Sequence, residues 1–143
     1  MRLLRWTFAA YLAAVLVVTC WPSPQSTAAP GWALAVLDAF RSAGLPMSYG
    51  FLEAASNVVM FVPFGVLGLL VLSGARPAVP LGRAVSLVVL AGFVLSLAIE
   101  VSQLVIPGRY STVQDVVMNT TGAVVGAVVV AGILGTRRPL TSS

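Results

Sequence analysis

One acidic residue, Glu100, interrupts an otherwise almost wholly apolar run from Ala84 to Ile106. A carboxylate can accept hydrogen bonds, hold a cation or take a proton as a general base. If this run crosses a membrane, an unpaired charge there costs on the order of several kcal/mol, so Glu100 is expected to be paired or part of a working site. The partners expected from the following stretch are Gln103, Arg109, Asp115 and Asn119.

Helical spacing places these polar groups on shared faces. Each of three segments carries two polar side chains four residues apart: Glu53 and Asn57, Ser96 and Glu100, and Asp115 and Asn119. In the predicted site, carboxylates accept hydrogen bonds, amides donate and accept them, and the guanidinium holds an anionic group. The predicted ligand-binding residues are Asn57, Glu100, Gln103, Arg109, Asp115 and Asn119, and the catalytic candidates are Glu100 and Asp115.

Composition indicates that the elements holding these residues lie in a membrane. Of the 143 residues, 59% are hydrophobic and 8% are charged, and the mean hydropathy is +1.01. A water-soluble domain of this length would not carry such a composition. We expect a single domain over residues 1–143, with room for about three to five spans. All eight basic residues are arginines near segment ends, which indicates membrane topology and not a nucleic-acid-binding surface.

The lack of histidine and the single cysteine, Cys20, narrow the chemistry. An internal disulfide, an imidazole base and most zinc or iron sites are excluded. We therefore expect no resident metal and no cofactor. Any chemistry must use carboxylates, amides, hydroxyls, arginine or backbone groups.

Four apolar segments have about the 20-residue length that crosses a hydrocarbon core of about 30 Å. They are predicted at Leu4–Trp21, Ala54–Ser73, Ala84–Ile106 and Val116–Gly135. Six arginines would lie on one side of the membrane, whereas Arg41 and Arg109 would lie on the other, so both termini are predicted to be cytoplasmic. The sequence thus predicts an all-α, multi-pass helix bundle with four transmembrane helices and a long first extracytoplasmic loop. The polar residues would lie in the outer leaflet.

Two parts of this topology have a second interpretation. The segment Leu4–Trp21 also resembles a cleavable signal peptide, because Arg2 and Arg5 precede a short apolar stretch. That alternative leaves the orientation of the other three spans unchanged. In the first loop, apolar residues recur at helical spacing over Gly31–Ala43, which fits a short helix in the membrane interface or a surface-packed linker.

Small residues and one proline indicate how the helices pack. Gly122 and Gly126 form a small-xxx-small pattern, which allows a neighbouring backbone to come close. Pro63 lacks the N–H that would bond to the carbonyl of residue 59, so a kink is predicted there. The predicted packing residues are Pro63, Gly65, Gly122 and Gly126.

In these residues the sequence resembles the VanZ-like family of small bacterial membrane proteins. The resemblance is carried by Asn57-x-x-x-Phe61-x-Pro63-Phe64-Gly65, by Ser96-x-x-x-Glu100-x-x-Gln103, by Arg109 with Asp115 six residues later, and by Asn119-Thr120-Thr121-Gly122 with Gly126. The matching motifs span residues 57–126. The resemblance implies a protein of the bacterial cytoplasmic membrane. The family's namesake is associated with low-level resistance to the glycopeptide antibiotic teicoplanin.

Four functions fit this pattern. The first is an outer-leaflet site that binds a membrane lipid's head group, a lipid-linked cell-wall precursor or a lipophilic glycopeptide antibiotic. The second is an enzyme of lipid or cell-wall chemistry, with Glu100 as general base or sharing a Mg²⁺ or Ca²⁺ ion with Asp115, although no nucleophile motif supports it. The third is a small proton-coupled exporter, whose site would be expected nearer the midplane. The fourth is a structural accessory subunit. The sequence does not indicate an oligomeric state.

Overall fold

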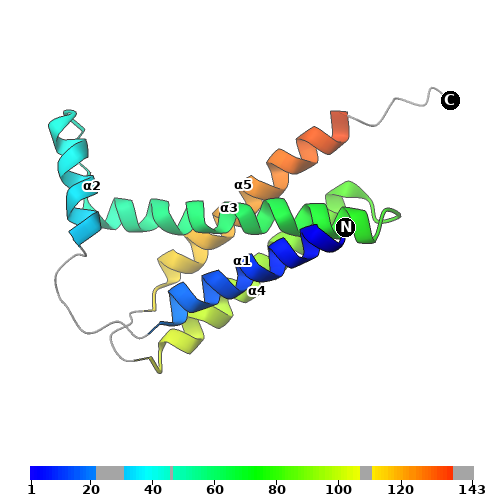
Figure 1. The fold of residues 1–143 in the computed structure, drawn as a ribbon, viewed down its shortest axis with the longest axis horizontal. Coiled ribbons are helices and arrows are strands. Elements are labelled where there is room, and N and C mark those ends of the chain that lie inside the picture. The colour runs from blue at the N-terminus through cyan, green and yellow to red at the C-terminus, as the bar shows by residue number, and fades with distance from the viewer. Residues whose placement is uncertain (22–30, 46, 107–110, 137–143) are drawn as a thin grey trace.

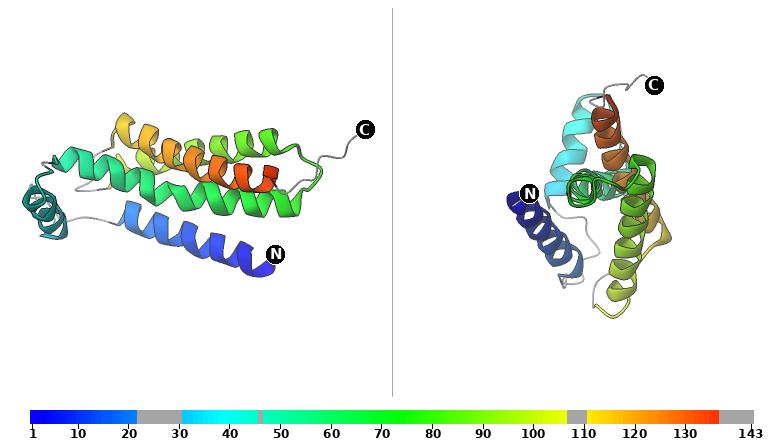
Figure 2. Two further views of the ribbon diagram at one scale, coloured as in Figure 1. Left: turned by 90° about the horizontal axis from the view of Figure 1, so that it is seen from above. Right: turned by 90° about the vertical axis from the view of Figure 1, so that its right-hand side faces the viewer.

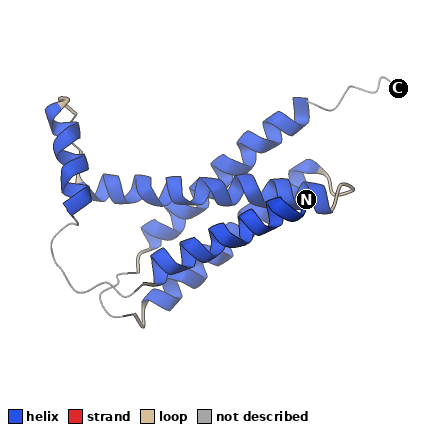
Figure 3. Ribbon diagram, viewed as in Figure 1, coloured by secondary structure: helices blue, strands red, loops and turns tan. Residues whose placement is uncertain are grey.

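The computed structural model describes residues 1–21, 31–45, 47–106 and 111–136. Within these ranges the chain forms five helices and no strand (Figure 3). Four of the helices are long and apolar enough to cross a membrane, with mean hydropathies between 1.8 and 2.4. They are α1 (Arg2–Cys20), α3 (Tyr49–Ala75), α4 (Leu81–Gln103) and α5 (Val113–Thr136), and the shorter α2 spans Gly31–Ser42. The predicted all-α class with four membrane-length helices is confirmed.

Local hydrogen bonds set two helix ends away from their predicted positions. The Ser48 side chain accepts from the backbone N–H of Phe51 at 3.2 Å, so α3 begins at Tyr49 and not at Ala54. Helix α4 ends at Gln103 because residues 104–106 turn through bonds to residues three positions earlier. The earlier start of α3 adds the turn that carries Glu53.

The four long helices run in alternating directions (Figures 1 and 2). The start of α1, the turn from α3 to α4 and the end of α5 therefore lie at one end of the bundle. The opposite end holds the end of α1, the start of α3, the end of α4 and the start of α5. This alternation agrees with the predicted order of spans. The side of the membrane that each end faces stays a prediction.

Helices α3 and α5 make the most extensive contact in the bundle, through glycines instead of large side chains. The two helices cross at an angle (Figure 1). A Cβ atom added to any of three glycines at this crossing would lie under 3.0 Å from the backbone of the facing helix. These close approaches are Gly65 to Ala123, Gly122 to Val58 and Gly126 to Val62. None of the three positions accepts a larger residue unless the helices move apart.

Helix α1 packs against α3 and α4, and its contact with α3 includes a bond near Pro63. Helix α3 continues through Pro63 as a single helix, so the predicted kink does not interrupt it. The Tyr11 hydroxyl of α1 donates to the backbone carbonyl of Met60 at 2.6 Å, within one turn of the proline. The ring of Phe8 meets that of Phe64 edge-on, with centroids 5.5 Å apart. These contacts place α1 along one side of the bundle (Figure 2).

The short helix α2 contacts α3 near its start and turns sharply away from the α3 axis (Figure 1). Ala33 and Leu37, four residues apart, are buried, whereas Leu34 and Phe40 remain partly exposed. The helical interpretation of Gly31–Ala43 is therefore confirmed. Its placement in the membrane interface stays a prediction.

The outward faces of the long helices are apolar. Leu90, Val94 and Leu97 of α4 and Val124 and Val128 of α5 are all well exposed. A water-soluble monomer rarely exposes so much contiguous apolar surface. A hydrocarbon environment satisfies these faces at no cost, whereas every buried polar group must find its partner inside the bundle.

Candidate functional site

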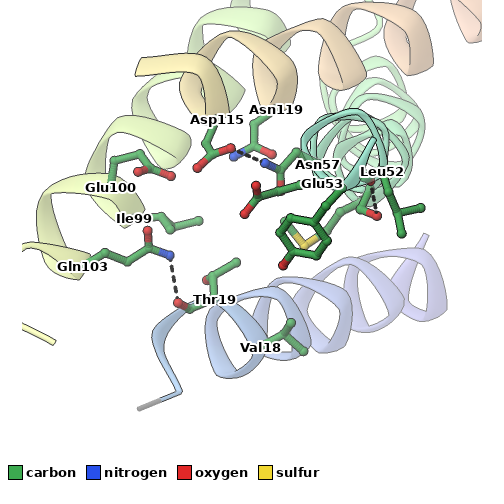
Figure 4. A pocket seen from close by; sticks show the side chains of 13 residues that line it. Val18, Thr19, Leu52, Glu53, Asn57, Ile99, Glu100, Gln103, Asp115 and Asn119 are labelled. Carbon is green, nitrogen blue, oxygen red and sulfur yellow. Dashed lines mark hydrogen bonds between the residues drawn. The ribbon is translucent and has the colours of Figure 1, made fainter. Parts of the chain in front are cut away.

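A cavity of about 360 Å³ lies between α1, α3, α4 and α5, at the end of the bundle away from the start of α1 and the end of α5 (Figure 4). All four long helices contribute to its wall, which mixes acids, amides and hydroxyls with apolar side chains. The described lining residues are Val18, Thr19, Tyr49, Leu52, Glu53, Ser56, Asn57, Met60, Ile99, Glu100, Gln103, Asp115 and Asn119.

Glu100 is 5% exposed and faces the interior of the bundle. Its Oε2 accepts from the backbone N–H of Thr112 at 2.9 Å. The Ser111 side chain also bonds to this carboxylate. The start of α5 presents free backbone N–H groups and the positive end of the helix dipole, both of which stabilise an anion. The predicted pairing of Glu100 is therefore with groups at the N-terminus of α5.

Asp115 links α5 to α3. Its Oδ1 accepts from Nδ2 of Asn57, and its backbone N–H donates to Oγ1 of Thr112 at 3.0 Å. Thr112 therefore acts as an N-cap for α5, three residues before an acid in the first turn. The same short segment holds Glu100 and orients Asp115, so the two carboxylates are fixed by one helix start.

Asn119 is 2% exposed and bridges α5 to α4 through a 2.9 Å bond from its Nδ2 to Oγ of Ser96. Its Oδ1 is also buried and has no hydrogen-bond partner among the described residues. Leaving a buried amide oxygen unpaired costs about 1–3 kcal/mol. Asn119 is also one of the residues that line the cavity.

Gln103 connects the cavity to α1. Its Nε2 donates to the backbone carbonyl of Thr19 at 2.9 Å, as Figure 4 shows. Next to this bond, Sγ of Cys20 and Oγ of Ser102 lie 3.5 Å apart. The end of α1 is thus attached to the end of α4 by polar contacts.

Glu53 supplies a third carboxylate, from α3. Its side chain is exposed and makes no hydrogen bond within the described part of the chain. Figure 4 shows Glu53, Glu100 and Asp115 turned toward the same space. None of the described lining residues is basic.

The ion pair between Arg41 and Asp38, at 3.3 Å, lies on α2 and does not involve a lining residue.

Five of the six residues predicted to bind a ligand line this cavity: Asn57, Glu100, Gln103, Asp115 and Asn119. Arg109 lies outside the described residues. The predicted packing residues lie elsewhere, since Gly65, Gly122 and Gly126 are at the α3–α5 crossing and Pro63 is beside it.

The predicted ligand-binding residues did not include Glu53 or Thr19. The spacing of four residues placed Glu53 on the same polar face as Asn57, but Glu53 stands before the predicted start of its span. Thr19 contributes mainly its backbone carbonyl, which accepts from Gln103. Every residue has a backbone carbonyl, so the sequence could not indicate that the carbonyl of Thr19 accepts this bond.

The polar part of the cavity wall consists of hydrogen-bonding groups. The hydroxyls of Ser56 and Thr19 donate to carbonyls of their own helices, each at 2.8 Å, and so are not paired with a carboxylate base. Among the described residues, no three His, Cys, Asp or Glu side chains are placed to hold a metal ion together. The cavity offers carboxylates and amides to a bound polar group.

Comparison with known proteins identifies the family. No curated protein and no solved structure gives a match to this chain. The model of the VanZ/LLP1 family matches residues 8–134. This match extends the resemblance from residues 57–126 to nearly the whole bundle, from the first half of α1 to the last turn of α5. The chain therefore belongs to the VanZ/LLP1 family.

Proposed function

We propose that this VanZ/LLP1 protein binds the polar head of an amphiphile in the cavity between its four long helices. The ligand would be a membrane lipid, a lipid-linked cell-wall precursor or a lipophilic glycopeptide, with its apolar part in the bilayer. One observation carries the proposal: acids and amides from three apolar helices surround a cavity of about 360 Å³. One of these lining residues, Asn119, has a buried Oδ1 that lacks a partner among the described residues.

Cavity size supports a head group as the occupant. Small-molecule sites in proteins have volumes of about 300–1,000 Å³, so this cavity lies near the lower limit. It can enclose a head group of a few polar atoms, whereas a whole lipid or a glycopeptide would exceed it. The remainder of such a ligand would lie along the exposed apolar faces of the helices.

Arginine distribution supports an outer-leaflet location in the bacterial cytoplasmic membrane. Arg2, Arg5, Arg76 and Arg83 belong to the end of the bundle away from the cavity, and the positive-inside tendency assigns that end to the cytoplasm. The cavity would then face the cell envelope. Head groups and wall precursors are present there, and glycopeptides act there. A link to antibiotic resistance would operate through such binding.

The exporter alternative receives less support from the position of the cavity. Its lining includes Thr19 near the end of α1, Glu53 near the start of α3 and Gln103 at the end of α4. Transport sites are typically close to the bilayer midplane. A cavity at the helix ends instead favours a ligand taken from the adjacent leaflet.

Native mass spectrometry of the purified protein after exposure to a bacterial lipid extract tests the binding. Wild type should retain a lipid or precursor after mild detergent washing. Glu53→Gln should reduce that retention about tenfold, since a hydrogen bond to a charged group is worth about 1.5–3 kcal/mol. Glu53 is the preferred position because its side chain makes no hydrogen bond within the described residues.

Glu100→Ala provides a second variant, and Asp38→Asn on α2 serves as the control. Glu100→Ala should abolish retention, with circular dichroism and gel filtration checking that the bundle still folds. Asp38 is exposed and does not line the cavity, so Asp38→Asn should retain ligand as wild type does. Equal retention by folded wild type, Glu53→Gln and Glu100→Ala would overturn the proposal.

A further inference from the structure

The cavity wall concentrates negative charge. Glu53, Glu100 and Asp115 approach it from α3, α4 and α5, and the described lining contains no basic residue to balance them. In surroundings of low dielectric constant, charges interact more strongly than in water. An anionic group entering this space would face three acids, whereas a cation would be attracted by all of them.

The hydrogen-bond inventory of the wall favours a donor as the ligand. Each lining amide already donates one N–H to the protein: Asn57 to Asp115, Gln103 to Thr19 and Asn119 to Ser96. The carboxylates can only accept when they are ionised, and the buried Oδ1 of Asn119 has no partner within the described residues. The wall therefore presents mainly acceptors.

Resting on the proposed function, we infer that the head group bound in this cavity carries a protonated primary amine. A primary ammonium brings one positive charge and three N–H donors, which match the carboxylates and the unpaired amide oxygen. A quaternary ammonium brings the charge without donors and is typically bound by several aromatic rings. Tyr49 is the single aromatic residue in the described lining, so the cavity does not suit that group.

Lipid-specific binding tests this inference directly. The protein is placed in nanodiscs or detergent with phosphatidylethanolamine, phosphatidylcholine or phosphatidylglycerol of identical acyl chains, and retention is measured by native mass spectrometry. Phosphatidylethanolamine should bind at least about tenfold more tightly than either of the others. The choline lipid keeps the phosphate and the positive charge but lacks the N–H donors, so it isolates hydrogen bonding from charge.

A soluble primary amine distinguishes the lipid from other sources of the same group. Butylamine at millimolar concentration should displace phosphatidylethanolamine, whereas tetramethylammonium should not. If butylamine binds and the lipid does not, the amine belongs to another molecule, such as an amino-bearing wall precursor, and the inference stands. If neither primary amine is bound in preference to its quaternary analogue, the inference is wrong.

Charge reversal at Glu53 sharpens the test. Glu53→Arg should weaken or abolish the preference for phosphatidylethanolamine over phosphatidylglycerol, because it removes one of three acids from the described lining and adds a positive charge at an exposed position. Asp38→Arg is the matched control on α2 and should leave the preference unchanged. Both variants are accepted only with wild-type circular dichroism and gel-filtration profiles.

The outcomes separate this inference from the proposed function. If wild type retains phosphatidylglycerol over phosphatidylethanolamine, and Glu53→Arg strengthens that binding, the cavity still binds head groups and only the amine assignment fails. If no lipid is retained in a way that depends on Glu53 or Glu100, the proposed function fails with it.

Discussion

Several polar side chains around the cavity join one helix to another. Asn57 connects α3 to α5, Asn119 connects α5 to α4, and Gln103 connects α4 to α1. Hydrogen bonds between membrane helices contribute about 0.6 kcal/mol on average, but leaving one partner buried and unpaired costs more. The same residues that offer hydrogen bonds to a ligand therefore also hold the wall of the cavity together.

The buried pair between Asn119 and Ser96 permits a test of this structural role. Ser96 is fully buried, so Ser96→Ala removes the acceptor of the Asn119 Nδ2 and leaves that donor without its partner. We expect a loss of about 1–2 kcal/mol in the free energy of unfolding, measured by thermal or denaturant unfolding in detergent.

Ser86→Ala is the matched control for that substitution. Ser86 lies on the same helix, is exposed, and donates to the carbonyl of Gly82 one turn earlier. Its replacement should change the free energy of unfolding by no more than about 0.5 kcal/mol. Equal effects of the two substitutions would contradict the importance of the Asn119–Ser96 bond.

Much of the cavity wall follows from polar spacing in the sequence. A polar residue inside an apolar helix has to face the bundle, and a spacing of four residues defines the face, so Glu100, Asn119 and Asn57 were predictable. The partner of Glu100 was not. Its carboxylate bonds to the backbone N–H of Thr112, and backbone groups are the same at every residue. The sequence indicated that the Glu100 carboxylate needs a hydrogen-bond partner, but it did not indicate which atom is that partner.

At the scale of the helices, hydropathy determined which elements form, and local hydrogen bonds determined where they end. Ala54 was predicted to begin a span because the preceding turn is less apolar, yet the Ser48 cap extends α3 back to Tyr49. That extra turn brings Glu53 to the cavity. Averaged hydropathy does not detect a cap, since a cap depends on one side-chain oxygen and one backbone N–H.

The glycine contact between α3 and α5 gives the prediction at this scale. A Cβ atom at Gly126 would collide with the backbone of Val62 and Val66, so Gly126→Ala should force the helices apart. We expect it to lower the free energy of unfolding by about 1–3 kcal/mol, measured by unfolding in detergent.

Gly132→Ala, in the same helix, is the control for this change. A Cβ atom there has no neighbour within 4 Å. Alanine also favours the helix over glycine by about 1 kcal/mol, so this variant should be as stable as wild type or slightly more stable. Greater destabilisation by Gly132→Ala than by Gly126→Ala would refute the described crossing.

At the scale of the whole molecule, the two ends of the bundle differ in character. One end holds the start of α1, the α3–α4 turn and the end of α5, together with Arg2, Arg5, Arg76 and Arg83. The other end holds the cavity and its acids. This polarity could be anticipated from arginine counting, because the alternation of four spans was evident in the sequence. The arrangement of the helices around the cavity required the structure, since side-chain packing selects it.

Topology reporters test the orientation. Fusions after Thr136 and in the turn between α3 and α4 should read as cytoplasmic, and one inserted between α1 and α2 should read as external. Paired green fluorescent protein and alkaline phosphatase fusions give opposite signals at each site, which provides an internal control. An external reading after Thr136 would place the cavity in the inner leaflet.

The residues that fix the positions of the α3 and α5 axes differ from the residues that select the ligand. The spacing of these helices depends on the absence of side chains at Gly65, Gly122 and Gly126, whereas the cavity lies nearer the helix ends. A change of charge at an exposed lining residue such as Glu53 therefore leaves the axes in place. One framework of this kind can accommodate head groups of different chemistry through substitutions confined to its rim.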